Sequence, residues 1–169
     1  HNFEQKINFN EIRALLREHC LSSLGREKVD DMAFSTDPHA INEWQEQTKE
    51  FRHILEEADN FPMQNFFDVR ESVSRIRLEG THLEEQELFD LRQSLSTIHL
   101  ITTFLQASTL QTTLSPTLHE AQKEVEDVQE ESTNKLYPAL YKLTESVITF
   151  PQLIQHIDRI LDKFGHIRD

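Results

Sequence analysis

Apolar residues recur at alternating steps of three and four along the middle of this chain, a spacing that places their side chains on one face of a helix. The first run has Thr102 in its one polar gap and consists of Leu88, Leu91, Leu95, Ile98 and Leu105. After a polar break at 108–113, the spacing resumes with Leu114, Leu118, Ala121, Val125 and Val128. Two such runs joined by a short link predict two long antiparallel helices, a helical hairpin over 81–135.

Capping residues and prolines predict shorter helices on both sides of this hairpin. Asn8 and Ser22 are expected caps, and Asp37 followed by Pro38 combines a capping carboxylate with proline at the first helical position. Thr81-x-x-Glu84 matches a capping box at the start of the hairpin. The expected helices run over about 9–20, about 22–33, about 38–59, about 68–78 and about 151–163, with a further one starting at Pro138.

No stretch alternates with a period of two for long enough to form a strand. We therefore predict an all-α fold, an elongated multi-helix bundle with a long antiparallel helical hairpin. It is expected to form a single domain over 1–169, with N-terminal helices at 1–80, the hairpin at 81–135 and C-terminal helices at 136–169. In the first helix we expect an inward face made of Ile12, Leu15 and Leu16. After the last helix we expect Gly165 in the left-handed conformation.

The net charge of −13 argues against a nucleic-acid contact surface on this segment, because affinity for phosphates comes largely from cations. The nearest approach to a basic stripe is a set of three candidate phosphate contacts, Arg70, Arg75 and Arg77. Solvated helix charges are the alternative interpretation. The one cysteine, Cys20, cannot form an internal disulfide, and no apolar run reaches the length of about 18–20 residues that a membrane span needs. We expect a cytoplasmic location without a membrane partner.

Two residue pairs have the spacing of half a di-iron site in a helical bundle, Glu50-x-x-His53 and Glu79-x-x-His82. Helical periodicity places Glu50 and His53 away from the apolar face, so we expect both to face water. The second pair spans an expected helix break at Gly80. We predict no metal ligands in this chain.

His19 and Cys20 are adjacent, and adjacent residues on a helix diverge by about 100°. Cys20 is therefore expected to be a small buried apolar residue instead of a nucleophile. The G-x-x-x-x-G-K-[ST] phosphate loop does not occur in these 169 residues. We predict no catalytic and no cofactor-binding residues.

Three blocks of the sequence, in this order, resemble the MutS family. The first is Ile7-Asn8-Phe9-Asn10-Glu11-Ile12 with Ser22-Ser23-Leu24-Gly25-Arg26-Glu27-Lys28-Val29. The second is Phe67-Asp68-Val69-Arg70 with Val73, Gly80, Leu83, Glu87, Leu88 and Leu91. The third is the final run, Ile157-Asp158-x-x-Leu161-Asp162-x-x-Gly165-x-Ile167-x-Asp169. The blocks are most similar to the second bacterial branch of that family, which lacks the mismatch-reading domain and carries a C-terminal small MutS-related nuclease domain.

This resemblance implies that the chain is the N-terminal core and lever region of a longer, homodimeric ATPase. The opening on His1 and the abrupt end after Ile167 suggest the same. ATP and Mg²⁺, the clamp and the nuclease would belong to other parts of the parent. Its implied roles are DNA repair, through suppression of recombination on branched DNA, and ribosome rescue, through splitting of collided ribosomes. Phe9-Asn10-Glu11 also matches the F-x-E of mismatch readers, but a core or staple role for Phe9 is the preferred interpretation.

The expected function is mechanical: long helices transmit nucleotide state to a substrate clamp. The candidate lever residues are Leu88, Leu91, Leu95 and Ile98, with facing partners Leu118, Ala121, Val125 and Val128. Two alternatives stay open. One is a stand-alone helical module that docks an amphipathic partner. The other is a helical metalloenzyme, which would retain iron or manganese on purification.

Overall fold

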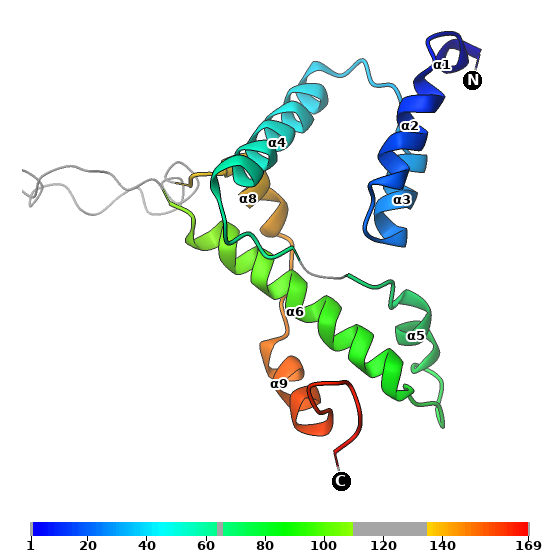
Figure 1. Cartoon of the computed structure of the whole chain (residues 1–169), viewed down its shortest axis with the longest axis vertical. Coiled ribbons are helices and arrows are strands. Elements are labelled where there is room, and N and C mark those ends of the chain that lie inside the picture. Colours follow the sequence, from blue (N-terminus) through cyan, green and yellow to red (C-terminus); the bar gives the residue numbers. More distant parts are fainter. Residues whose placement is uncertain (1, 64–65, 110–134, 169) are drawn as a thin grey trace, which may run out of the picture. The chain divides into compact units, whose positions relative to one another are not determined.

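The computed structural model describes residues 2–63, 66–109 and 135–168, and this part of the chain is helical (Figure 1). The helices are α1 (Asn2–Lys6), α2 (Phe9–Glu18), α3 (Ser23–Asp30), α4 (Pro38–Glu57), α5 (Arg70–Arg75), α6 (Glu85–Ala107), α8 (Pro138–Thr144) and α9 (Pro151–Ile160). Within the described ranges β pairing is confined to isolated bridges. The all-α prediction is confirmed. The long hairpin stays a prediction, because its second arm with Leu118, Ala121, Val125 and Val128 lies outside the described residues.

The chain forms two compact units. Unit 1 comprises residues 1–35, 63–98 and 150–169, and unit 2 comprises residues 36–62 and 99–149. Helix α6 contributes its residues up to Ile98 to unit 1 and its residues from His99 onward to unit 2. One continuous helix therefore contributes residues to both units.

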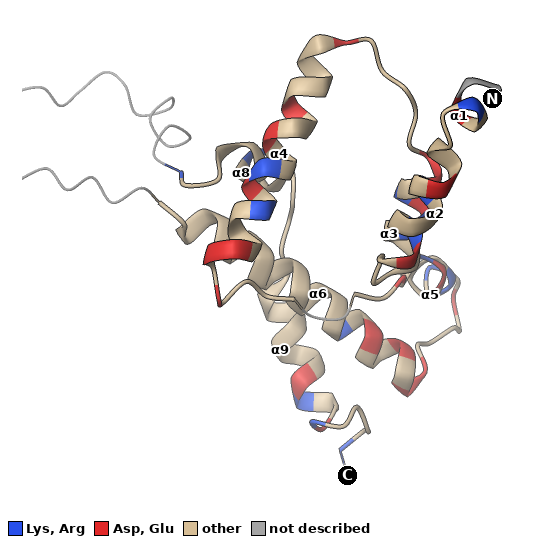
Figure 2. Cartoon of the chain, turned by 45° about the horizontal axis from the view of Figure 1, so that its top comes forward, with Lys and Arg blue, Asp and Glu red and all other residues tan. Residues whose placement is uncertain are grey.

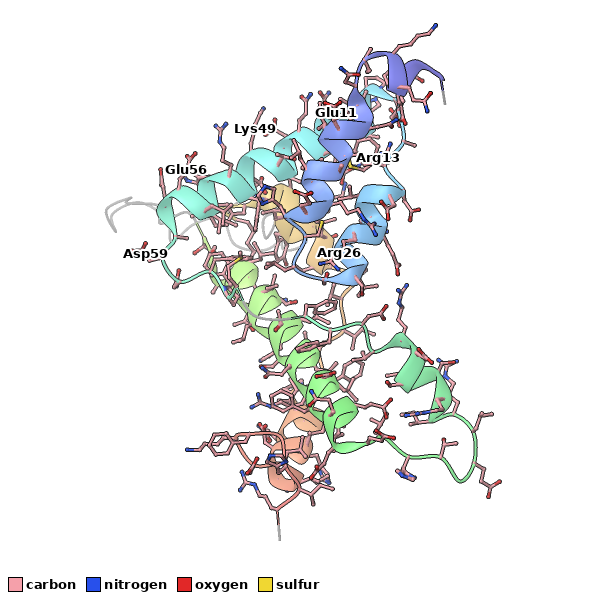
Figure 3. All side chains as sticks on the ribbon, turned by 45° about the vertical axis from the view of Figure 1, so that its right-hand side comes forward. Glu11, Arg13, Arg26, Lys49, Glu56 and Asp59 are labelled. Atoms are coloured by element: carbon pink, nitrogen blue, oxygen red, sulfur yellow. The ribbon has the colours of Figure 1, made fainter. Side chains whose placement is uncertain are left out.

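Arg13 fastens the first three helices of unit 1 together (Figure 3). Its Nη1 donates to the carbonyl oxygens of Val29, Asp30 and Met32, each at 2.9 Å. Its Nη2 lies 3.2 Å from both carboxylate oxygens of Glu4. Carbonyls at the end of a helix lack partners within the helix and carry partial negative charge. The guanidinium therefore closes the C-terminal end of α3 and holds α1 beside it.

The N-terminal predictions hold in part. Ser22 caps α3 as expected, because its Oγ accepts from the Gly25 amide at 3.1 Å. Asn8 precedes α2 but has a φ of 55° and makes no side-chain bond to the helix, so the expected side-chain cap is wrong. The expected inward face of α2 is also wrong: the exposed fractions of its members are Ile12 50%, Leu15 58% and Leu16 42%. The side of α2 that meets α3 is the side of Arg13.

Unit 2 is built around three buried side chains from three elements. Ile54 of α4, Leu105 of α6 and Tyr137 before α8 are 0%, 5% and 4% exposed. Phe61 packs edge-on against Phe51 and Phe104, with ring centroids 5.4 and 5.2 Å apart. Offset and edge-on ring pairs are the favoured aromatic geometry. This apolar cluster anchors the second half of α6.

Helices α4 and α8 begin where their prolines predict. Asp37 caps α4, with Oδ1 accepting from the His39 amide at 2.9 Å. Helix α8 begins at Pro138. Its free N-terminal amides donate to a side chain of α4, a helix that is far away in the sequence. Glu50 of α4 accepts from the amides of Ala139 at 3.0 Å and Leu140 at 2.8 Å. The expectation that Glu50 faces water is therefore wrong, since its carboxylate is the missing cap of α8.

The start of α6 differs from the expected capping box. The Thr81 hydroxyl instead donates to the carbonyls of Arg75 at 2.9 Å and Leu78 at 2.7 Å, closing the turns that follow α5. The reciprocal bond of a capping box occurs three residues later, where Glu87 Oε2 accepts from the Glu84 amide at 2.9 Å. Helix α5 is shorter than the expected 68–78, and α9 ends at Ile160 instead of 163.

Residues on either side of positions 110–134 are joined to each other. Thr109 and Lys135 form an antiparallel bridge, and the Leu136 amide donates to the Ser108 carbonyl at 2.9 Å. Lys135 Nζ also donates to the Gln106 carbonyl at 2.7 Å. In the described part of the chain, no helix has both the length and the apolarity needed to cross a bilayer.

Candidate functional site

The final sequence block builds the end of α9 and a hairpin loop after it, residues 161–168, here called the C-terminal loop. Ile157 in α9 and Leu161 at the start of the loop are 2% and 3% exposed, so both are buried where the loop leaves the helix. Leu161 forms an antiparallel bridge with Ile167. The Arg168 amide donates to the Ile160 carbonyl at 2.8 Å, so the chain folds back onto the end of α9.

Asp162 organises the C-terminal loop from within. Its Oδ1 accepts from the amides of Phe164 at 2.8 Å and His166 at 2.9 Å. Its own amide donates to the His166 carbonyl at 2.7 Å. The backbone bond from His166 is the main reason that the pKa of Asp162 lies below its usual value. An ionised aspartate therefore stabilises the loop.

Gly165 adopts the left-handed conformation, with a φ of 90°, which confirms that expectation. It does not directly follow the helix, because Leu161 already leaves α9 in an extended conformation. A Cβ at Gly165 would lie 2.8 Å from Cδ2 of Phe89, well inside van der Waals contact. Glycine is required here twice, for its positive φ and for the close approach of the loop to α6.

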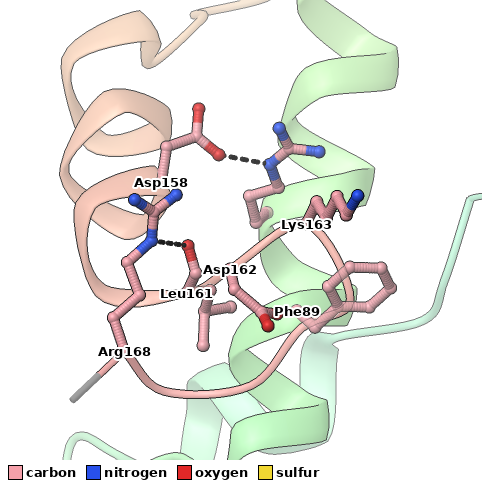
Figure 4. A pocket seen from close by; sticks show the side chains of 7 residues that line it. Phe89, Asp158, Leu161, Asp162, Lys163 and Arg168 are labelled. Atoms are coloured by element: carbon pink, nitrogen blue, oxygen red, sulfur yellow. Dashed lines mark hydrogen bonds and ion pairs between the residues drawn. The ribbon is translucent and has the colours of Figure 1, made fainter.

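Polar contacts complete the docking of the C-terminal loop on the first half of α6 (Figure 4). Glu85 Oε1 accepts from the Ile167 amide at 2.6 Å, and its Oε2 lies 3.8 Å from His166 Nδ1. Arg92 Nε donates to Asp158 Oδ1 at 2.7 Å. Glu85 belongs to the acidic first turn of α6, seen as red segments in Figure 2, where carboxylates complement the helix dipole.

Glu87 joins the same half of α6 to α5. Its Oε1 accepts from the Ser72 hydroxyl at 2.8 Å, and its Oε2 pairs with the Arg75 guanidinium. The backbone amide of Glu84, then the Ser72 hydroxyl and the Arg75 guanidinium, hold the pKa of Glu87 below its usual value. One carboxylate therefore serves as helix cap and as link between two helices.

Ser94 makes a second connection, to the extended chain before α5. Its Oγ accepts from the Phe67 amide at 2.9 Å and donates to the Phe67 carbonyl at 3.1 Å. Ser94 is 2% exposed and Thr97 is 3% exposed. The candidate lever residues of this half, Leu88, Leu91, Leu95 and Ile98, are half-buried. Sequence reasoning ranked apolar residues first and missed these two buried hydroxyls, whose spacing of three was the available signal.

Arg70 links the first two sequence blocks. Its guanidinium lies 2.6 Å from Asp68 Oδ2 and 2.6 Å from Glu27 Oε1. The side-chain hydrogen bond from Arg70 is the main reason that the pKa of Asp68 falls from the usual 3.8 to about 2. Arg70 and Arg75, two of the candidate phosphate contacts, are thus already engaged by carboxylates. Arg77 takes part in no ion pair within the described ranges.

The residues considered for other chemistry occupy structural positions. His53 lies edge-on to Tyr137 at 6.0 Å between ring centroids, and its Nε2 is 3.3 Å from Glu57. The Cys20 thiol donates to the Leu16 carbonyl at 3.3 Å in a half-buried position. Phe9 is half-buried under the Arg13 guanidinium, 5.4 Å from its ring centroid. Among the described residues, no three His, Cys, Asp or Glu side chains lie close enough together to hold a metal ion.

Comparison with known proteins matches nearly the whole chain. Endonuclease MutS2 of Geobacillus sp. (strain WCH70) is 28% identical over 163 residues, which are 96% of this chain and 18% of that protein. Endonuclease MutS2 of Halalkalibacterium halodurans is 26% identical over 165 residues, again 96% of this chain and 18% of that protein. Endonuclease MutS2 of Bacillus mycoides (strain KBAB4) is 33% identical over 72 residues, 43% of this chain and 9% of that protein.

The chain therefore spans 18% of the length of the first two relatives. No family model matches it, and no solved structure matches it.

Proposed function

Because this chain is a segment of the MutS2 family, we propose that it is a non-catalytic helical core and lever of a longer MutS2-type protein. One observation carries the proposal: residues of the three resembling blocks meet at the joints of unit 1. Glu27 of the first block pairs with Arg70 of the second. Asp158 and Gly165 of the third block contact the first half of α6, to which Glu87 of the second block belongs. In the described part of the chain, these family residues hold helices together.

Helix α6 is the lever in this proposal. It is continuous over Glu85–Ala107, with one half fixed by the joints of unit 1 and the other by the apolar cluster of unit 2. A packed helix moves as one body, so a small shift imposed on one half reaches the other. A coupling of about 1–3 kcal/mol between two sites is enough for regulation.

The rest of the polypeptide supplies the chemistry in this proposal. The relatives are named endonucleases, and we propose that the parent of this chain is one too. ATP with Mg²⁺ would bind to another part of a homodimeric parent in the cytoplasm, and a clamp would hold the substrate. We propose two candidate substrates for the parent: branched DNA, in suppression of recombination, and the collided ribosome. Unit 1 and unit 2 would transmit the nucleotide state to that clamp.

The test softens α6 without touching its buried side. Leu100 is 38% exposed and Thr103 is exposed, so both can be changed to glycine together in the full-length protein, with the double alanine variant as control. Each glycine weakens the helix by about 1 kcal/mol relative to alanine. We expect the double glycine variant to bind ATP normally while ATP no longer changes its affinity for branched DNA or ribosomes. Normal coupling in that variant, or equal loss of ATP binding, contradicts the lever.

A stand-alone interaction module is the second candidate, favoured by apolar exposure on residues 1–35. Leu21 is 77% exposed and Phe34 is 82% exposed, in addition to the outward face of α2. Large exposed apolar groups are typical of partner surfaces. The coding sequence that follows Asp169 separates the two candidates. A phosphate loop a few hundred residues downstream supports the lever, and a stop codon near Asp169 supports the module.

A further inference from the structure

The N-terminal helices α2 and α3 are folded without a buried core. Neither helix has a buried residue, and no described side chain over residues 4–35 is buried. Arg13 joins these helices through hydrogen bonds instead. Helices in proteins are stabilised chiefly by packing of an apolar face, and isolated helices shorter than about 12–15 residues are marginal in water. Helix α2 has 10 residues, so it lacks the packing that would make it stable.

One side of α2 is available for such packing. Ile12, Leu15 and Leu16 follow helical spacing, are 50%, 58% and 42% exposed, and are here called the apolar face of α2. Helix α2 packs against α1 and α3, and the side that meets α3 is that of Arg13. Burial of large aliphatic side chains is a main source of folding stability. Covering the apolar face would therefore supply what α2 lacks.

The charges beside the apolar face indicate what kind of helix fits it. Glu11 and Glu18 are exposed and seven residues apart, so they lie two turns apart on one edge, here called the acidic edge. Across the part of the chain that the structure describes, neither carboxylate is in an ion pair. Arg13 projects from a different side of α2 than Glu11 (Figure 3), and both Arg13 and Arg17 are already paired with carboxylates. A complementary helix therefore carries Lys or Arg beside its own apolar residues.

A second copy of this chain is a poor occupant of the apolar face. In an antiparallel pair of α2 helices the acidic edges of the two copies would face each other, and like charges repel. In a parallel pair the acidic edge would face arginines that are already engaged. The net charge of −13 adds a general repulsion between copies.

The size of the apolar face favours a segment of the same polypeptide over a separate protein. Ten helical residues are only about 15 Å long, so this face alone is too small to bury the roughly 800 Å² per partner of a stable complex. A tethered segment needs less area, because its effective concentration is on the order of millimolar. The curated relatives have room for such a segment, since the match covers 18% of their length.

We propose that an amphipathic helix with a Lys- or Arg-bearing edge, supplied by another part of the parent polypeptide, packs on the apolar face of α2 and pairs with its acidic edge. This inference rests on the longer parent that is proposed above. It gives α2 a partner, and it does not require that α6 act as a lever.

Amide hydrogen exchange of the full-length protein tests this proposal. We expect the amides of α2 to be protected, and Leu15→Ala combined with Leu16→Ala to accelerate their exchange on the order of tenfold. Alanine is the best helix former, so this double change removes apolar contact without weakening the helix itself. Leu55→Ala is the matched control, because Leu55 is 57% exposed, close to the 58% of Leu15, but belongs to α4. It should leave the exchange of α2 unchanged.

The same measurement identifies the occupant. A segment outside residues 1–169 should lose protection together with α2 in the double alanine variant, and it should carry Lys or Arg beside an apolar stripe. Glu11→Lys combined with Glu18→Lys should accelerate exchange in the same two segments. An α2 that is unprotected in the full-length protein, or unchanged by the charge reversal, overturns the proposal.

Two further outcomes also overturn it. Protection of α2 that is lost on dilution indicates a second copy, and loss of protection confined to residues 1–169 places the partner within this chain. These outcomes are distinct from a failure of the lever, which is measured as coupling between ATP and substrate.

Discussion

The two halves of α6 are attached to their units by different kinds of contact. The first half is attached in unit 1 by hydrogen bonds and partly exposed ion pairs, such as Arg92 with Asp158, whose side chains are 33% and 44% exposed. The second half is attached in unit 2 by buried side chains, with Leu105 only 5% exposed. Exposed ion pairs contribute about 0–1 kcal/mol each, whereas truncating a buried aliphatic side chain costs about 2–5 kcal/mol. Each exposed ion pair of the first half is therefore expected to contribute less than each buried apolar side chain of the second half.

The largest expected effect comes from removing part of the buried apolar cluster of unit 2. Ile54→Ala removes a side chain that is 0% exposed, so we expect a loss of about 2–5 kcal/mol in the free energy of unfolding. Leu55→Ala, at the adjacent position with 57% exposure, should cost less than about 1 kcal/mol. Urea denaturation followed by circular dichroism measures both. Equal losses in the two variants would show that unit 2 lacks the core described above.

The next effect tests how closely the C-terminal loop meets α6. Gly165→Ala adds a Cβ at a positive φ and 2.8 Å from Phe89, and we expect a cost of about 2–4 kcal/mol from strain plus overpacking. Gly80→Ala is the control, since Gly80 also has a positive φ of 81° but has nothing within 4 Å of an added Cβ. Thermal unfolding should show a loss of only about 1–2 kcal/mol for that control. If the two variants unfold alike, the contact with Phe89 contributes nothing.

A smaller effect concerns the cap that α4 provides to α8. Glu50→Ala leaves the amides of Ala139 and Leu140 without their acceptor, and we expect a loss of about 1–2 kcal/mol, as for other helix caps. Glu56→Ala serves as control because Glu56 is 62% exposed and, among the described residues, its ion pair is with the exposed Arg52 (Figure 3). Amide hydrogen exchange in α8 should accelerate in the first variant alone. Acceleration in both variants would assign the effect to helix α4 instead of the cap.

The smallest effect is a pH dependence confined to unit 1. The pKa of Asp68 is depressed from 3.8 to about 2, so its contribution to stability is present above pH 3.8 and is lost as the pH falls toward 2. Asp68→Asn should remove this part of the acid dependence, and an NMR titration of the carboxyl carbon should give the midpoint directly. A midpoint at the usual value would show that Arg70 does not hold the carboxylate in solution.

The sequence predicted features that depend on near neighbours. Pro38, Pro138 and Pro151 each begin a helix, because proline at the first helical position acts locally. The left-handed Gly165 was predictable for the same reason, whereas its contact with Phe89 was not, since the two are distant in sequence. The capping box was placed three residues early because Thr81 and Glu84 both fit the pattern, and only tertiary contacts decide which one caps.

Long-range polar contacts account for most of the errors. Arg13 and Glu50 act on helix ends that lie far along the chain, and no periodicity reveals such partners. Helical spacing placed Ile12 on the apolar face of α2. Helix α3, however, contacts the side of α2 that carries Arg13. The sequence marked the three blocks by their family resemblance but assigned their polar residues no partners. Their contacts with one another became visible only in three dimensions.

The bridge between Thr109 and Lys135 holds together the two positions that flank residues 110–134. Because these two positions are held together, the number of residues between them can change while the aromatic cluster of unit 2 keeps its own contacts. Doubling a closed loop costs only about 0.6 kcal/mol in chain entropy. An insertion or deletion between these two positions should therefore cost the rest of unit 2 little stability.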